Sequence, residues 1–169
     1  MPKAKGRKAI LTMFADANLY HDRLTGRSGT GLILIANKTP IDWFSKKQLS
    51  VESATYGSEF VAARIGTYKL VEMRYMLRML GVPIDGPSIM FGDNLAVINS
   101  ASIAEDTLKK RHNALSYHRV REAIAAKVLK FYHISGKENP ADILTKFLPS
   151  AVWWPLMKPM LHWPDKNNP

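Results

Sequence analysis

The sequence contains no cysteine, so disulfide bonds and metal sites built on thiolates are excluded. Any bound metal must then be held by carboxylates or histidines, which favours a hard cation. No apolar run approaches the roughly 20 residues that a membrane-spanning helix needs. Residues 1–8 are basic but lack the long apolar segment of a secretory signal. These absences predict an intracellular protein with no membrane partner.

Acidic residues are a minority among the charged side chains. The 169-residue chain has 24 Lys and Arg against 14 Asp and Glu, a formal net charge of +10 at pH 7. A surplus of this size attracts polyanions at long range, so nucleic acid is the leading class of partner. A solubilising surface charge without a particular partner is the alternative.

Internal repeats and low-complexity tracts are also absent, and the length suits one compact domain. We expect a basic N-terminal tail over residues 1–9, a folded domain over 10–148 and an aromatic, proline-rich extension over 149–169. The extension either packs on the domain as an apolar flap or links it to something else.

Three apolar runs open the domain. Residues 10–15 form a run that stops at Asp16, and residues 31–36 and 41–45 form two more, separated by turn residues. Links this short favour an antiparallel three-stranded meander, because parallel neighbours need a longer crossover.

Helical and strand patterns then alternate. From Thr55 to Gly81 apolar residues recur at steps of three, four or their multiples, which predicts one long helix. The remaining pattern predicts a strand and a helix within residues 88–98, a polar linker at 102–110, a helix within 117–128, a strand over 128–134 and a helix from Asn139 to Lys146. The predicted fold class is α/β, with three antiparallel strands and two more added through helices to make a mixed five-stranded sheet.

Four acidic residues stand out by their predicted positions. Asp16 and Asp93 end apolar strands, where α/β proteins gather their chemistry. Glu59 lies early in the long helix, on its apolar stripe, where a lone charge is costly unless it is paired or binds a metal. Asp142 lies in the first turn of the last helix, where the helix dipole favours an anion. Turn, capping and surface roles are the alternatives, and the pattern leaves open whether the four side chains converge.

Six sequence blocks carry a resemblance to a known family. They occur in the order MFADANLYHDRLTGRSGTG, PIDWFSKKQ, ESATYGSEFVAAR, IMFGDN, KKRHNALSYHRVREAIAA and GKENPADILTK, and the match runs from about Phe14 to about Lys146. In this order they resemble the ribonuclease H domain of copia-type retrotransposon polyproteins. The resemblance implies a ribonuclease H fold, in agreement with the predicted order of strands and helices.

The resemblance also implies a site and an activity. Asp16, Glu59, Asp93 and Asp142 match the family's four catalytic acids, which bind two Mg²⁺ ions, with Mn²⁺ as a possible substitute. One ion activates a water as the nucleophile and the other stabilises the leaving 3′ oxygen, which leaves 5′-phosphate products. The implied substrate is the RNA strand of an RNA/DNA hybrid, and the implied partner is the reverse transcriptase domain of the same polyprotein.

Residues beside the acids and on one basic helix are candidate substrate contacts. By family position, Ala17, Asn18 and Asn94 would contact the minor groove, and Thr55 is a weaker candidate for a phosphate pocket. Basic residues would bind phosphates without sequence specificity, and a solvated helix face is their alternative role. These basic residues are Lys109, Lys110, Arg111 and Arg119, together with His112, His118, Arg121, Lys46 and Lys47.

One departure from the pattern concerns histidine. Cellular ribonucleases H usually carry a histidine between the last strand and the fourth acid, whereas residues 134–141 contain none. His133 lies on the predicted strand, where a packed or structural role is the simpler explanation, so Lys137 or water would have to take its place.

Two other classes of function stay open. One is a catalytically weak nucleic-acid-binding or docking domain of the same fold, which the presence of all four acids disfavours. The other is a different phosphodiester enzyme on this fold, such as an integrase or a DNA-directed nuclease, which the order of the blocks disfavours.

Overall fold

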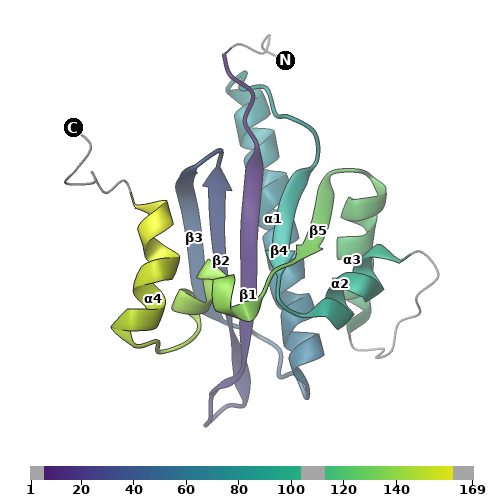
Figure 1. Ribbon diagram of the computed structural model, residues 1–169. Helices are drawn as coiled ribbons and strands as arrows, with labels where there is room; N and C mark the ends of the chain where they lie inside the picture. Colours follow the sequence, from purple (N-terminus) through teal and green to yellow (C-terminus); the bar gives the residue numbers. More distant parts are fainter. Residues whose placement is uncertain (1–5, 104–112, 162–169) are drawn as a thin grey trace.

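A five-stranded sheet forms the centre of the protein, in the order β3-β2-β1-β4-β5 (Figure 1). The computed structural model describes residues 6–103 and 113–161. Its strands are β1 Leu11–Asp22, β2 Arg27–Ala36, β3 Thr39–Lys47, β4 Ser88–Gly92 and β5 Leu129–His133. The first three pair antiparallel, whereas β4 is parallel to β1 and β5 is parallel to β4, because helices return the chain before each of these strands. The predicted mixed sheet is confirmed.

Three helices cover one face of this sheet. They are α1 Thr55–Met79, α2 Leu95–Ser102 and α3 Ala114–Ala125. In the view of Figure 1, α1 runs behind β1 and β4, while α2 and α3 lie beyond β5. The other described helices are the short 3-10 segments η2 Gly136–Glu138, η3 Pro140–Leu144 and η4 Lys158–Met160, and the helix α4 Ser150–Met157. Of these, η3 crosses in front of the sheet and α4 lies beside β3 (Figure 1).

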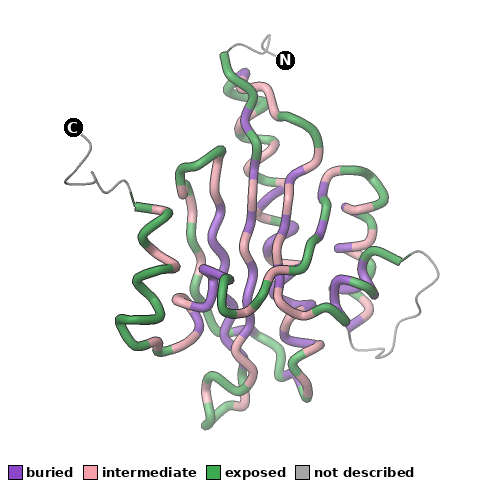
Figure 2. The backbone as a smooth tube through the Cα atoms, viewed as in Figure 1, coloured by how far each residue is buried: buried purple, intermediate pink, exposed green. Residues whose placement is uncertain are grey.

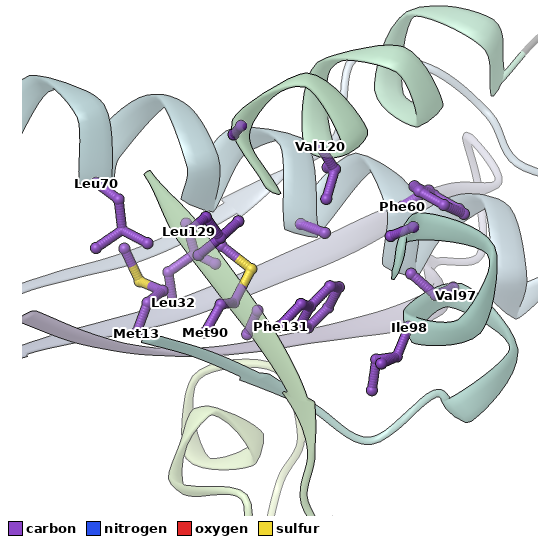
Figure 3. Close-up of a cluster of buried hydrophobic side chains, with 14 of the residues drawn as sticks. Met13, Leu32, Phe60, Leu70, Met90, Val97, Ile98, Val120, Leu129 and Phe131 are labelled. Carbon is purple, nitrogen blue, oxygen red and sulfur yellow. The ribbon is translucent and has the colours of Figure 1, made fainter. Parts of the chain in front are cut away.

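The hydrophobic core lies between the sheet and the helices, as the purple segments of Figure 2 show. Met13 and Leu32 from the sheet pack with Phe60 and Leu70 of α1, and Val120 of α3 closes the cluster (Figure 3). Burying a side chain of this size contributes roughly 1.5–3 kcal/mol relative to leaving it exposed. This packing fixes the middle of β1, the end of β4 and the start of α1, where Asp16, Asp93 and Glu59 lie.

The first strand is longer than the apolar pattern predicted. It was expected to stop at Asp16, but β1 continues to Asp22 and the turn is confined to residues 23–26. Residues 18–22 break the apolar run and only Leu19 among them is aliphatic, yet the backbone pairs with β2 at Asn18 opposite Gly29 and, after a register shift, at Asp22 opposite Arg27. Backbone pairing in the hairpin therefore extends the strand beyond its apolar half, and Asp16 lies inside the strand rather than at its end.

The last predicted helix is also corrected. Asn139 caps it as expected, since its Oδ1 accepts a hydrogen bond from the backbone N–H of Ala141 at 3.1 Å. The segment from Pro140 to Leu144 is nevertheless a 3-10 helix and not an α-helix through Lys146. Its ends are tied to β1 on either side, by Asn139 to the carbonyl of Ala15 and by Lys146 to Asp16, which favours the tighter turn.

Two helices are each followed by a residue with a positive φ, the conformation that glycine often adopts after a helix. α1 ends before Gly81, whose φ is +76°, and the N–H of Val82 bonds back to the carbonyl of Leu77 at 2.8 Å. α3 ends earlier than predicted, because Lys127 adopts a φ of +55° and Val128 turns back to bond Ala123 at 3.0 Å. Most of the predicted polar linker at 102–110 lies outside the described residues.

The described part of the C-terminal extension lies against the sheet. Met157 and Leu161 line a cavity of about 320 Å³ together with Trp43 of β3 and Ile143 of η3. α4 itself has no buried residue, so the choice between flap and linker and the boundary at residue 148 stay predictions. Within the described ranges, no helix combines the length and the apolar character that crossing a bilayer requires.

Candidate functional site

Three carboxylates meet where β1, β4 and α1 come together. Asp16 lies inside β1, Glu59 lies in the second turn of α1, and Asp93 directly follows β4. One carboxylate oxygen from each lies within 4.8 Å of the other two. Asp16 is 1% exposed, so this concentration of negative charge is largely removed from water. Such a group can hold a metal ion, since each acid offers a hard oxygen ligand.

Asn94, not Asp93, caps the helix that follows β4. Its Oδ1 accepts hydrogen bonds from the N–H groups of Ala96 at 3.1 Å and Val97 at 3.3 Å. The carboxylate of Asp93 is therefore not used as a cap and faces the other acids. Gly136 approaches it from η2, where an added Cβ would lie 3.1 Å from Asp93 Oδ2.

Glu59 is held against β1 by a backbone bond. The N–H of Ala17, the residue that follows Asp16, donates a hydrogen bond to Glu59 Oε1 at 3.2 Å. Burial raises the pKa of Glu59 well above its usual range, and the negative charges of Asp16 and Asp93 raise it further. Burial and the charge of Asp16 also raise the pKa of Asp93. Burial and the neighbouring negative charges thus both disfavour the charged forms of Glu59 and Asp93.

Asp142 lies beside Asp16 but outside the group of three mutually close carboxylates. Its Oδ1 accepts a bond from Lys146 Nζ at 2.9 Å, and the same ammonium lies 3.3 Å from Asp16 Oδ1. The hydroxyl of Thr145 donates to the other oxygen of Asp16. Burial raises the pKa of Asp142 to about 6, with a further contribution from Asp16 that the hydrogen bond from Lys146 opposes. Partial burial acts against the charge of Lys146, yet the bond to Asp142 and the charge of Asp16 raise its pKa overall.

A glycine in β2 allows η3 to approach the acids. Gly31 pairs with Asp16, and a Cβ there would lie 2.7 Å from Thr145 Cγ2 and 2.8 Å from the carbonyl of Ala141. Asn139 adds a second attachment, because its amide donates to the carbonyl of Ala15 at 2.9 Å. Asp142 is thus placed beside Asp16 by close backbone packing.

The acids open onto a cleft of about 560 Å³. All four residues predicted as substrate contacts by family position line this cleft, and several others join them. The lining residues are Asp16, Glu59 and Asp93, the predicted contacts Ala17, Asn18, Thr55 and Asn94, and in addition Leu19, Leu95, Ala96 and Lys146. The cleft therefore contains the three mutually close carboxylates and is lined by the residues predicted to contact the substrate beside them.

Relatives were found among transposon polyproteins, although no family model matches the chain. The Retrovirus-related Pol polyprotein from transposon TNT 1-94 of Nicotiana tabacum is 29% identical over 144 residues, or 85% of this chain. The corresponding polyprotein from transposon RE2 of Arabidopsis thaliana is 28% identical over 142 residues, or 84% of the chain. The chain spans only about a tenth of these relatives, 11% of the first and 10% of the second.

Solved structures decide the fold. The N-terminal RNase H domain of rv2228c from Mycobacterium tuberculosis matches with a TM-score of 0.62 at 12% identity, over 89% of this chain and 98% of that one. LC11-RNase H1, isolated from compost, matches with 0.59 at 15% identity, over 80% and 91%. The chain has the ribonuclease H fold. Together with the Pol polyprotein relatives, this confirms the resemblance to copia-type ribonuclease H domains that the sequence blocks carried.

On this ribonuclease H fold, the predicted basic surface does not reach the cleft within the described residues. Lys109, Lys110, Arg111 and His112 lie outside those residues. Arg119 pairs with Glu122 at 2.9 Å and lies over the ring of Tyr68 at 4.9 Å, away from the cleft lining. The other predicted basic residues lie elsewhere too. Arg121 donates hydrogen bonds to the carbonyls of Ser100 and Ile103, and His118 is exposed on α3. On β3, Lys47 pairs with Asp22 and Lys46 lies over the ring of Phe44.

Two residues that contact the acidic cluster were not predicted from the sequence. Thr145 and Lys146 both contact Asp16, although they lie inside the block GKENPADILTK that carried the resemblance. The available signal was the spacing of Lys146 four residues after Asp142, which places opposite charges together on a helix. His133 is exposed at the end of β5, and its Nε2 lies 3.2 Å from the carbonyl oxygen of Asp93, a contact with backbone only.

Proposed function

We propose that the chain is a metal-dependent ribonuclease H that hydrolyses the RNA strand of RNA/DNA hybrids by two-metal-ion catalysis. The observation that carries this proposal is the meeting of Asp16, Glu59 and Asp93 in one open cleft. Solved proteins of this fold support the substrate class, since LC11-RNase H1 and a foamy viral protease-reverse transcriptase both have structures in complex with RNA/DNA hybrid.

The residues present fit divalent cations. Asp16, Glu59 and Asp93 offer only carboxylate oxygens, which Mg²⁺ and Mn²⁺ prefer. Neighbouring negative charges help to raise the pKa of Glu59 and of Asp93, and a bound dication would offset these charges. These three residues would hold the first ion, and Asp142 would join Asp16 in holding a second. When bound, such ions lower the pKa of a coordinated water and polarise the scissile phosphate.

The chain's own groups orient the acids before any ligand binds. The N–H of Ala17 holds one oxygen of Glu59, and the hydroxyl of Thr145 holds one oxygen of Asp16. Asn94 uses its Oδ1 to cap α2, which leaves its amide N–H groups to a substrate in the cleft. Donors at this wall can bind the 2′-hydroxyls by which RNA differs from DNA.

Water is the proposed proton carrier in place of the loop histidine. Of the two replacements considered, Lys137 lines a different groove, beside Phe14 and Pro140. Lys137 is not among the residues that line the cleft with Asp93, although its neighbour Gly136 approaches that carboxylate. Proton transfer through water would make turnover slower than in ribonucleases H that carry the histidine.

A reverse transcriptase domain of the same polyprotein is the proposed partner. The curated relatives are much longer than this chain, which covers only 10% or 11% of each. The structure of Prototype Foamy Virus Protease-Reverse Transcriptase includes this fold within a larger chain. The match covers 94% of the present chain and 22% of that one, with a TM-score of 0.55 at 12% identity.

Cleavage of a hybrid with a short ribonucleotide stretch tests the function. With Mg²⁺, the chain should cut the RNA strand and leave 5′-phosphate ends, and Asp93→Asn should lower the rate by about a hundredfold or more. The same assay on an all-DNA duplex should give no product. Binding of hybrid without cleavage would favour the docking domain, and cleavage of the DNA duplex would favour a different phosphodiester enzyme.

A further inference from the structure

A lysine ammonium lies on the side of the site where Asp142 is found. Lys146 Nζ lies 2.9 Å from Asp142 Oδ1 and 3.3 Å from Asp16 Oδ1, so one cation bridges two acids from distant parts of the chain. The two carboxylates are 12% and 1% exposed, against 35% for the lysine side chain. The pair is therefore largely enclosed, while the cation that neutralises it reaches solvent.

We propose that Lys146 is a built-in cation that competes with the second divalent ion for the pair Asp16 and Asp142. This inference rests on the proposed function and concerns the order in which its ions bind. The first ion would be held mainly by Glu59 and Asp93, for which no bond to a lysine is described, with Asp16 as the ligand that both ions share. The second binds only when the ammonium leaves, so Lys146 sets the metal concentration at which the site is filled.

The positions of the contacts support competition rather than a passive ion pair. An ammonium and a divalent ion both seek the same carboxylate oxygens, and like charges a few ångströms apart cannot share them at low cost. The positive charge of Lys146 also reaches Glu59 and Asp93, so the lysine partly offsets the repulsion of the whole cluster. Its departure would leave four carboxylates around one bound dication, an excess of negative charge that a second dication offsets.

The geometry also allows the lysine to leave while the acids stay. Lys146 lines the open cleft and has a flexible four-carbon stem. Asp16 keeps its bond from the Thr145 hydroxyl, and Asp142 is held in η3, whose cap residue Asn139 is bonded to Ala15. The two acids therefore remain side by side after the ammonium has moved away.

Titration of the metal-free chain with Mn²⁺ tests this competition, with free Mn²⁺ measured by electron paramagnetic resonance. The wild type should bind one ion tightly and a second more weakly. Lys146→Met removes the charge but keeps an unbranched side chain, and it should tighten the second ion by at least about tenfold without weakening the first. Lys146→Arg keeps the charge and should retain the weak second ion. Lys130→Met, an exposed lysine on β5, should behave as the wild type.

A second ion bound with the same affinity by wild type and Lys146→Met would overturn the inference, as would a single ion in both. Failure of the metal site itself gives a different result, because then neither protein binds even the first ion and Asp93→Asn changes nothing. Failure of the proposed substrate is measured separately, by the absence of hybrid cleavage when both ions are bound. If Lys146→Met does not fold without metal, Lys146→Gln keeps a hydrogen-bonding group and is titrated in its place, with the same tightening expected.

Discussion

The two sides of the site are built in different ways. On one side, Glu59 and Asp93 face Asp16 with raised pKa values and without a lysine or arginine bonded to either of them among the contacts described above. On the other side, Asp142 meets Asp16 through the ammonium of Lys146. The protein leaves the first side charged and ready for a cation, and it supplies a cation of its own to the second. Asp16 belongs to both sides and ties them together.

Substituting Asp16 should break both sides at once and have the largest effect. Asp16→Asn removes the carboxylate that both proposed ions share, so hybrid cleavage should fall by about a hundredfold to a thousandfold. The rate of RNA-strand cleavage under single-turnover conditions measures this loss. Asp22→Asn is the matched control, because Asp22 lies on the same strand but pairs with Lys47 at the hairpin. Retention of more than a tenth of the wild-type rate by Asp16→Asn would contradict the shared role.

Gly31→Ala should damage only the side that carries Asp142. Its Cβ would lie 2.7 Å from Thr145 and 2.8 Å from the carbonyl of Ala141, so η3 must move away from β2. We expect a loss of roughly 1–3 kcal/mol in the free energy of unfolding, as for other overpacked sites. Urea denaturation measures it. Gly29→Ala is the control on the same strand, because its nearest neighbour is the side chain of His21 at 3.3 Å. An equal loss in both variants would show that η3 packing is not the cause.

Asn94→Ala should destabilise the start of α2, next to Asp93. Without its Oδ1, the N–H groups of Ala96 and Val97 lose their cap, which typically costs about 1 kcal/mol. Asn94→Asp keeps the cap and should retain the stability of the wild type, as measured by thermal unfolding. Should Asn94→Ala be as stable as Asn94→Asp, another group must cap α2 and the assignment of Asp93 as a free carboxylate would be weakened.

The smallest expected effect is a change of the free energy of unfolding with pH, which follows from the raised pKa values of the acids. A carboxyl whose pKa is raised on folding binds its proton more tightly in the native state, so stability falls as pH rises from its unfolded pKa toward the raised value. For Asp142, this loss runs from the ordinary value of 3.8 up to about 6. Burial and the charge of Asp16 raise the pKa of Asp93 in the same direction.

In metal-free buffer, Asp93→Asn should therefore be more stable than the wild type at pH 7, by roughly 1 kcal/mol or less. Near pH 3, below the ordinary Asp pKa of 3.8, the difference should vanish because both residues are then uncharged. Thermal unfolding in a chelator at the two pH values measures this. A variant that is less stable than the wild type at pH 7 would mean that Asp93 is not repelled in the native state.

The pattern of apolar residues was sufficient to predict the order of the strands and helices and the long helix α1. This is because the core depends on residues such as Phe60 and Leu70 that recur at helical spacing. It failed for the second half of β1, where polar residues are held by pairing with β2 and not by burial. For this reason, Asp16 was correctly predicted to belong to the first strand, but the prediction that it ends the strand was wrong.

The site was less predictable than the sheet. The meeting of Asp16, Glu59 and Asp93 depends on three elements that only the tertiary structure brings together, and the resemblance, not the spacing, predicted it. The bridge of Lys146 to Asp16 joins residues far apart in sequence, so only its bond to Asp142 had a local signal. Likewise, the sequence did not predict that the guanidinium of Arg119 lies over the ring of Tyr68 on α1, and its role as a substrate contact stays a prediction.

Cleavage of an RNA/DNA hybrid as Mg²⁺ is raised from zero tests the central claim most directly. The account predicts no cleavage in the presence of a chelator and RNA-strand cleavage that rises more steeply than the first power of the Mg²⁺ concentration, because two ions are needed. Cleavage that persists in the chelator, or no cleavage of the RNA strand at saturating Mg²⁺, would contradict it.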